Sequence, residues 1–229
     1  MTLEFLFDPS LGLLEVLPGS TNIPEDSFKQ RDDIQMVIFP DDLDTIDSNA
    51  FAYCRNLKKL NLPDSLSSIG KEAFFANFSL ESLVIPDSVV SIGDYAFQYG
   101  RSLQSVHIGD AVTSIGKRSF SNAWVLSDLK LGDSLTTIGE KAFYRNPQLI
   151  DVTIPDSVTR IGNEAFAGTG ITSVVLPNHF LDNPPTAAFE PGTDFSYRSE
   201  PSLNSGEITK EGWQSNGNSG VWTAEADRL

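Results

Sequence analysis

Phenylalanine recurs through most of the chain at a fixed interval. Each step is 23 residues long, and the series runs Phe5, Phe28, Phe51, Phe74, Phe97, Phe120, Phe143, Phe166 and Phe189. Self-similarity at one period of roughly 20–50 residues is typical of solenoids and other repeat architectures. The interval therefore predicts coils of equal length that stack on one another.

Other apolar residues keep the same register. They recur six, nine, eleven and eighteen residues after each Phe, as at Leu57, Leu60, Leu62 and Ile69. The segment 57–62 has the L-x-x-L-x-L pattern of a leucine-rich-repeat strand, and its last part alternates inward and outward positions. Leu11 takes the first of these places in the N-terminal unit, so we expect it in the core.

Turn residues follow each predicted strand. A Pro-Asp or Gly-Asp step lies at 63–64, 86–87, 109–110, 132–133 and 155–156. Such steps end a strand and begin a turn. A second apolar stretch, S-V-x-S-I-G, then leads into Ala-Phe. Its glycine recurs at 70, 93, 116, 139 and 162, where we expect it to give the backbone freedom that a corner needs.

A single unit buries too few apolar side chains to offset the ordering of its 23 residues. Stacked neighbours share one core and add ladders of backbone hydrogen bonds. Eight strands at ~4.8 Å spacing give a parallel sheet about 35–40 Å long. Such a surface suits a protein or a glycan better than a small molecule.

The written-out unit 80–97, L-E-S-L-V-I-P-D-S-V-V-S-I-G-D-Y-A-F, resembles the BspA-like, or treponemal, class of leucine-rich repeats. The consensus of that class is L-x-x-(V/I)-x-I-P-x-S-V-T-x-I-G-x-x-A-F-x-x-C, and the resemblance covers about residues 5–189. It implies a curved right-handed solenoid with a parallel β-sheet of about eight 23-residue repeats. Members of the class are mostly surface-exposed or secreted bacterial and protist proteins implicated in adhesion and host-protein binding.

The last consensus position departs from the class. Its cysteine is present only as Cys54, and Asn77 and Asn146 occupy equivalent places. A residue here is expected to bond the turn backbone. With one cysteine in the chain, no internal disulfide is predicted.

The register predicts the domain organisation. Residues 1–190 form the solenoid, with an N-terminal capping unit at 1–27 and an irregular terminal unit at 167–189. The tail, 191–229, loses the period. Within it, 194–198 alternates as a strand that would cap the open sheet edge, and the remainder is expected to be flexible or part of a further module.

The net charge limits the kinds of partner that we expect, and the N-terminal sequence bears on the expected location. Acidic residues outnumber basic ones, 31 to 16, for a formal net charge of −15, and this field repels phosphate backbones and anionic lipid. Residues 1–16 have no basic n-region and no sustained apolar run, so they predict neither a secretory signal nor a membrane span. A cytoplasmic location is the alternative to the cell-surface or secreted location that the resemblance implies.

Residues seven, eight and ten after each Phe are predicted to point away from the core, on the concave face that is the natural binding surface of the family. The candidate partner-binding residues are Leu13, Met36, Ile38, Lys58, Lys59, Glu81, Val84, His107, Asp128, Lys130 and Asp151. The apolar members form a recognition patch, or they are covered by the N-terminal cap or simply tolerated. The charged members indicate electrostatic steering or an ordinary solvated face.

Aspartate recurs at the turns, at positions 41, 64, 87, 110, 133 and 156. Carboxylates in a row suit calcium, but no spacing resembles a closed calcium loop, so each is expected to accept hydrogen bonds from its own turn. Cys54 and His107 lie two repeats apart, roughly 10 Å by strand spacing, too far for a nucleophile and its base. No catalytic, cofactor or metal site is predicted.

These features predict a non-enzymatic module that binds a protein or a glycan, with a monomer as the default state. The leading hypothesis is a cell-surface or secreted protein in adhesion or host interaction. An intracellular scaffold or effector, and a structural spacer within a larger chain, are the alternatives.

Overall fold

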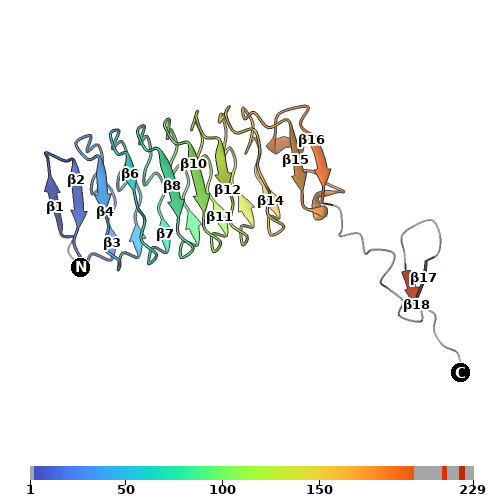
Figure 1. Cartoon of the computed structure of the whole chain (residues 1–229), viewed down its shortest axis with the longest axis horizontal. Coiled ribbons are helices and arrows are strands. Elements are labelled where there is room, and N and C mark those ends of the chain that lie inside the picture. Colours follow the sequence, from blue (N-terminus) through green and yellow to red (C-terminus); the bar gives the residue numbers. More distant parts are fainter. Residues whose placement is uncertain (1–2, 199–212, 216–221, 225–229) are drawn as a thin grey trace, which may run out of the picture. The chain divides into compact units, whose positions relative to one another are not determined.

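The computed structural model describes residues 3–198 and the two short strands 213–215 and 222–224. The chain divides into two compact units, Met1–Arg198 and Ser199–Leu229. In the first unit the chain winds through successive coils that place strands in two rows (Figure 1). The predicted parallel-strand solenoid, with about eight turns of about 23 residues, is confirmed.

The first row contains the strands predicted from the L-x-x-L-x-L segments. It consists of β2 (Leu13–Val16), β4 (Met36–Ile38), β6 (Lys59–Leu60), β8 (Ser82–Ile85), β10 (Ser105–Ile108), β12 (Asp128–Lys130) and β15 (Ser173–Leu176). Strands of neighbouring repeats pair in parallel at equivalent positions, so that Val106 is opposite both Leu83 and Leu129. The hydrogen-bonded pairing is interrupted between β6 and β8, and residues 151–155 are not assigned to a strand.

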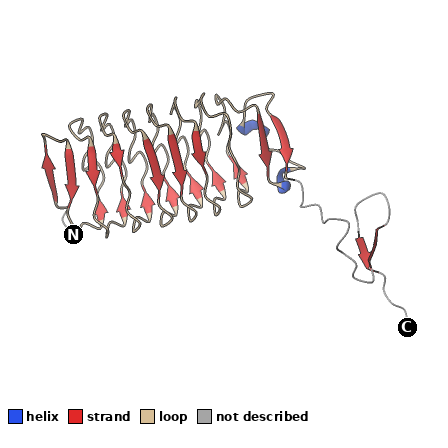
Figure 2. Ribbon diagram, in the orientation of Figure 1, coloured by secondary structure: helices blue, strands red, loops and turns tan. Residues whose placement is uncertain are grey.

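The S-V-x-S-I-G segments form a second row that the sequence pattern did not reveal (Figure 2). One seven-stranded parallel sheet joins β3 (Asn22–Ile23), β5 (Thr45–Ile46), β7 (Ser68–Ile69), β9 (Ser91–Ile92), β11 (Ser114–Ile115), β13 (Thr137–Ile138) and β14 (Arg160–Ile161). Each strand has two residues, too few to show an alternating pattern. The isoleucines face the core and all except Ile161 are fully buried.

The corner around each periodic Phe forms a third ladder of backbone bonds. N–H groups of Tyr95, Phe97 and Tyr99 donate to carbonyls of the next coil at 2.7–2.9 Å, and the other coils repeat this pattern. Residues two before and two after the Phe are left-handed, and thirteen non-glycine residues have φ between 53° and 65°. The left-handed turns aim the N–H groups along the solenoid, so the ladder offsets the strain of these residues.

The phenylalanines form a continuous stack in the core. Phe28 to Phe166 are at most 1% exposed, and consecutive rings from Phe28 to Phe189 have centroids 5.1–5.5 Å apart and planes within 19° of parallel. This separation exceeds the contact distance of about 3.5 Å between carbon atoms, so the rings are offset, as their quadrupoles favour. The repeat interval therefore builds one continuous core.

The recurrent glycines have a different role from the one expected. Gly70, Gly93, Gly116, Gly139 and Gly162 do not have left-handed φ. A Cβ on Gly116 would lie 2.5 Å from the carbonyl carbon of Gly93, and its equivalents in the other coils meet backbone at 2.5–2.7 Å. The expectation of conformational freedom was wrong, because these glycines permit close backbone contact between coils.

The N-terminal unit ends the stack with a hairpin. Strand β1 (Phe5–Asp8) pairs antiparallel with β2, and the Phe5 ring packs edge-on against Phe28 at 5.1 Å. The turn between the two strands carries Leu11 into solvent, where it is 61% exposed. The core position expected for Leu11 was therefore wrong, since the hairpin replaces the usual strand entry.

The other end of the stack is closed by short elements and one strand. The 3₁₀ helices η1 (Asn178–Phe180) and η2 (Thr186–Ala188) precede β16 (Asp194–Tyr197), which pairs in parallel with β15. The Phe195 ring packs edge-on against Phe189 at 5.5 Å. The boundaries expected at 27, 167 and 189–190 stay predictions.

The second unit contains one described hairpin, β17 (Trp213–Ser215) paired antiparallel with β18 (Trp222–Ala224). The rest of the tail after residue 198, which was expected to be flexible or part of a further module, lies outside the described residues. Within the described part of the chain, no helix has the length and apolar character needed to cross a membrane.

We expect Gly116→Ala to destabilise the solenoid by about 1–3 kcal/mol, the range for overpacking a close contact. Gly100→Ala is the matched control, because its Cβ would meet no atom closer than 3.4 Å. Urea unfolding followed by circular dichroism would compare the two. Equal midpoints for both variants would contradict a role for Gly116 in close backbone contact.

Candidate binding face

The outward side chains of the first row form a surface that we call the strand face. Each strand alternates between core and solvent, as in β8, where Leu83 and Ile85 are buried and Ser82 and Val84 are exposed. The outward positions are eight and ten residues after each Phe, as the alternation predicts. The strand face therefore displays residues that the core does not constrain.

None of the predicted partner-binding residues is buried. Leu13 and Met36 are half-buried, and the exposed members are Ile38, Lys58, Lys59, Glu81, Val84, His107, Asp128, Lys130 and Asp151. Lys58 and Glu81 immediately precede their strands, and Asp151 lies where no strand is assigned.

Lateral pairing brings some of the candidates together in two groups. Leu13, Met36 and Lys59 lie directly opposite one another on β2, β4 and β6. The second group, Val84, His107 and Lys130, lies on β8, β10 and β12 in the same relation. Because opposite residues in a sheet are about 5 Å apart, each group is a contiguous row.

The first group borders a shallow cavity. The cavity has a volume of about 320 Å³ and is lined by Met36, Ile38, Lys59 and Asn61, with Asp41 and Asp64 from the adjoining turns. Ile38 is 46% exposed, so an apolar surface lies next to one cation and two carboxylates. This combination suits a peptide side chain that has an apolar body and a polar end.

His107 of the second group makes a polar contact with a residue of the neighbouring strand β12. The Nε2 atom of His107 lies 2.9 Å from Oδ2 of Asp128. The other charged candidates, Lys58, Lys59, Glu81, Lys130 and Asp151, have no ion-pair partner within the described residues. Their charges are therefore available to a partner.

Two further apolar residues lie near this surface. Ile150 is 70% exposed and Val175, on β15, is 48% exposed. Ile150 lies seven residues after Phe143, at a position that the repeat pattern selects. Val175 lies nine residues after Phe166, so the fixed spacing misses it, and only the alternation within β15 places it outward. The apolar surface is thus not limited to the N-terminal strands.

The turn aspartates bond between coils. The Asp87 carboxylate accepts a hydrogen bond from the Asp110 N–H at 2.8 Å, and Asp110 accepts one from Asp133 at 3.3 Å. The expectation that each Asp bonds its own turn was wrong for these residues, because the neighbouring coil brings an N–H within reach. Within residues 3–198, no group of three or more acidic, His or Cys side chains has the arrangement to hold a metal ion.

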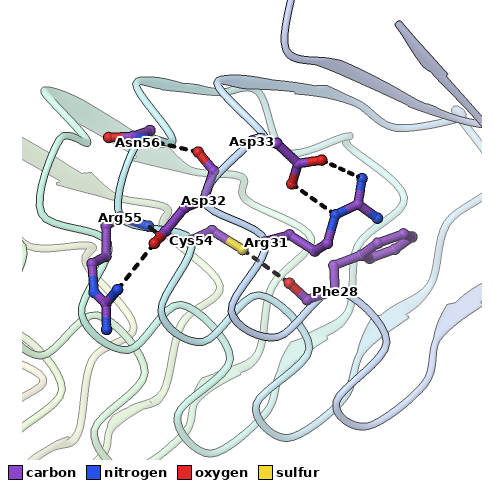
Figure 3. Close-up of polar contacts among 7 residues, drawn as sticks. All are labelled: Phe28, Arg31, Asp32, Asp33, Cys54, Arg55 and Asn56. Carbon is purple, nitrogen blue, oxygen red and sulfur yellow. Dashed lines mark hydrogen bonds and ion pairs between the residues drawn. The ribbon is translucent and has the colours of Figure 1, made fainter. Parts of the chain in front are cut away.

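Two of the three polar residues at the last consensus position bond the backbone of the preceding coil. Cys54 Sγ donates to the Phe28 carbonyl at 3.0 Å (Figure 3), and Asn146 Nδ2 donates to the Phe120 carbonyl at 3.0 Å. Asn77 is buried without a hydrogen-bond partner for its side-chain amide in the described structure. Burial raises the pKa of the Cys54 thiol to about 12, so this group is a structural donor and not a nucleophile.

The architecture, with its repeated Phe corner and L-x-x-L-x-L strands, defines a leucine-rich-repeat protein. The family model described as BspA type leucine rich repeat region matches six copies, over residues 21–77 and 72–191. The chain therefore belongs to the BspA type leucine-rich-repeat family. No curated protein sequence matches it.

Solved structures show the same fold at low sequence identity. The leucine-rich-repeat protein of T. pallidum is 20% identical with a TM-score of 0.67, over 85% of this chain and 97% of that one. A leucine-rich-repeat protein of Bacteroides ovatus is 22% identical with a TM-score of 0.51, over 80% and 59%. The pneumococcal vaccine antigen PcpA is 22% identical with a TM-score of 0.52, over 78% and 55%. The chain thus spans less than two thirds of the last two proteins.

We expect native Cys54 to resist iodoacetamide at pH 8. A pKa near 12 lowers the thiolate fraction there roughly a thousandfold relative to an ordinary thiol, and the side chain is fully buried. Mass spectrometry would follow alkylation in the native and urea-unfolded chains. Asn56→Cys adds an exposed thiol two residues away as a control for reagent quality. If Cys54 were labelled as fast in the native chain as in the unfolded chain, its burial would be contradicted.

Proposed function

We propose that the chain is a non-enzymatic protein-binding module whose strand face holds a partner protein. The observation that carries this proposal is the lateral row of Leu13, Met36 and Lys59 beside the cavity of about 320 Å³. A rigid strand surface presents such side chains with little loss of conformational entropy on binding. Apolar contacts then supply affinity, and the unpaired charges supply specificity.

A protein is favoured over a glycan on this face. The outward positions of the first-row strands carry no Phe, Tyr or Trp, as the sequences of β4, β8 and β10 illustrate. Recognition here therefore depends on aliphatic and charged side chains, which match the surface of a protein.

The proposed location is the cell surface or the exterior, in adhesion or host interaction. Membership of the BspA type family supports this location. Among proteins with the same fold, PcpA is named as a pneumococcal vaccine antigen. A spacer within a larger chain would have the same fold and would need no partner on the strand face.

A charge-reversing variant of the strand face tests the function. We expect Ile38→Glu combined with Lys59→Glu to weaken capture of the partner at least tenfold, because it places carboxylates at the cavity. Quantitative proteomics after affinity capture, from the source organism and from cells that it contacts, would measure enrichment. The partner would then be purified and its Kd determined.

The matched control is Val90→Glu combined with Arg160→Glu. Val90 is 50% exposed, close to the 46% of Ile38, and both control residues lie on or beside the second row of strands. The control should retain binding. Equal enrichment by the wild-type chain and the strand-face variant would reject the strand face as the binding surface and favour the spacer.

A further inference from the structure

The turn four residues after the periodic Phe holds a different kind of side chain from coil to coil. The series is Asp32, Arg55, Phe78, Arg101, Trp124 and Pro147. Because the coils share one repeat pattern, the fold does not prescribe a residue type at this position. The run Phe78, Arg101, Trp124 in three consecutive coils is therefore not a requirement of folding.

Arg101 is held between two aromatic rings. Its guanidinium carbon lies 4.5 Å from the Phe78 ring centre and 4.7 Å from the Trp124 ring centre. Both distances are within the range of cation–π attraction. The neighbouring coils thus immobilise a long side chain that is exposed to solvent.

The guanidinium of Arg101 is not neutralised. Within the described residues it forms no ion pair, and its side chain donates no hydrogen bond. Arg55, at the equivalent place two coils earlier, lies 3.0 Å from the Asp32 carboxylate (Figure 3). Of the two arginines at this repeat position, Arg55 has a carboxylate partner, whereas Arg101 lies between two rings and has none.

Aromatic side chains gather on this turn edge. Trp124 is 47% exposed and Val125 is 40% exposed. On the adjacent residues of the same coils, Phe75 makes edge-on contacts with Tyr53 at 5.2 Å and Tyr99 at 5.4 Å. Trp, Tyr and Arg are the residue types most enriched at the energetic centres of protein interfaces.

We propose that this turn edge, centred on Arg101, is a second binding surface that accepts an Asp or Glu of a partner protein, flanked there by apolar residues. The guanidinium would receive the carboxylate through two N–H donors, and Trp124 would cover the apolar neighbours. The surface lies in the Phe corner and not on the strand face, so this inference goes beyond the proposed function.

Charge favours an isolated carboxylate over a polyanionic glycan. The formal net charge of −15 opposes the approach of a densely charged polymer. The site offers one unpaired guanidinium among rings, which matches a single anion in an apolar setting.

Two display libraries of short peptides would test the site on the full chain. One has a central Glu and the other a central Gln, with flanking positions drawn from Leu, Phe, Trp, Ser and Gly. We expect the Glu library to be enriched on the wild-type chain and on the control Arg55→Gln, and not on Arg101→Gln. Fluorescence anisotropy with the selected peptides should show binding to Arg101→Gln weakened roughly tenfold to a hundredfold, as for the loss of charge-assisted hydrogen bonds.

Two more variants are needed. One distinguishes the effect of the charge of Arg101 from that of its planar shape, and the other distinguishes binding at the turn edge from binding at the strand face. Arg101→Lys keeps the charge and loses the planar arrangement of N–H donors, so it should also bind the Glu peptides weakly. If Arg101→Gln does not fold, Arg101→Lys serves as the test variant in its place. Ile38→Glu, on the strand face, should bind the Glu peptides normally. The proposal would be overturned if the Gln library were enriched as strongly as the Glu library, or if both Arg101 variants bound the peptides as the wild-type chain does. It would also be overturned if the chain bound no peptide but was retained on heparin through Arg101.

Discussion

The close approach of successive coils is the constraint on which the structure depends. Phenylalanine rings stack at 5.1–5.5 Å, near the ~4.8 Å spacing of paired strands. At this distance the carbonyl carbon of Gly93 leaves no room for a Cβ at position 116. Core, corner and sheets must therefore keep the same period, because a change of length in one would misalign the others.

The same constraint determines how the polar backbone is satisfied. Each coil is short of internal partners, so its N–H and carbonyl groups bond to the coils before and after it. Side chains extend this pattern, since the hydroxyls of Ser65, Ser88 and Ser157 donate to carbonyls of the preceding coil at 2.6–2.7 Å. Stability then follows from interfaces between neighbours, as expected for a nearly one-dimensional array.

The sequence predicted the features of the fold that depend on the repeat period. Repeat length, the buried Phe series and the outward alternation of the strands followed from the spacing of apolar residues. The second sheet was missed because its two-residue strands are too short for a periodic signal, and the left-handed turns because most of their residues are not glycine. Leu11 was misplaced because a hairpin replaces the repeat at the N-terminus. Of the candidate site, the sequence predicted which residues face outward but not the cavity, which depends on the turns at Asp41 and Asp64.

A repeat separates the demands of folding from those of recognition. Leu60 and Phe51 are fixed by the core, whereas position ten after the Phe holds Ile38, Val84, His107 or Lys130 without changing the strand. The turn edge has the same freedom four residues after the Phe, where the coils hold Asp32, Arg55, Phe78, Arg101, Trp124 or Pro147. Substitutions on either surface therefore alter the chemistry offered to a partner with little effect on the stack. The two proposed surfaces can in this way differ in chemistry independently of each other.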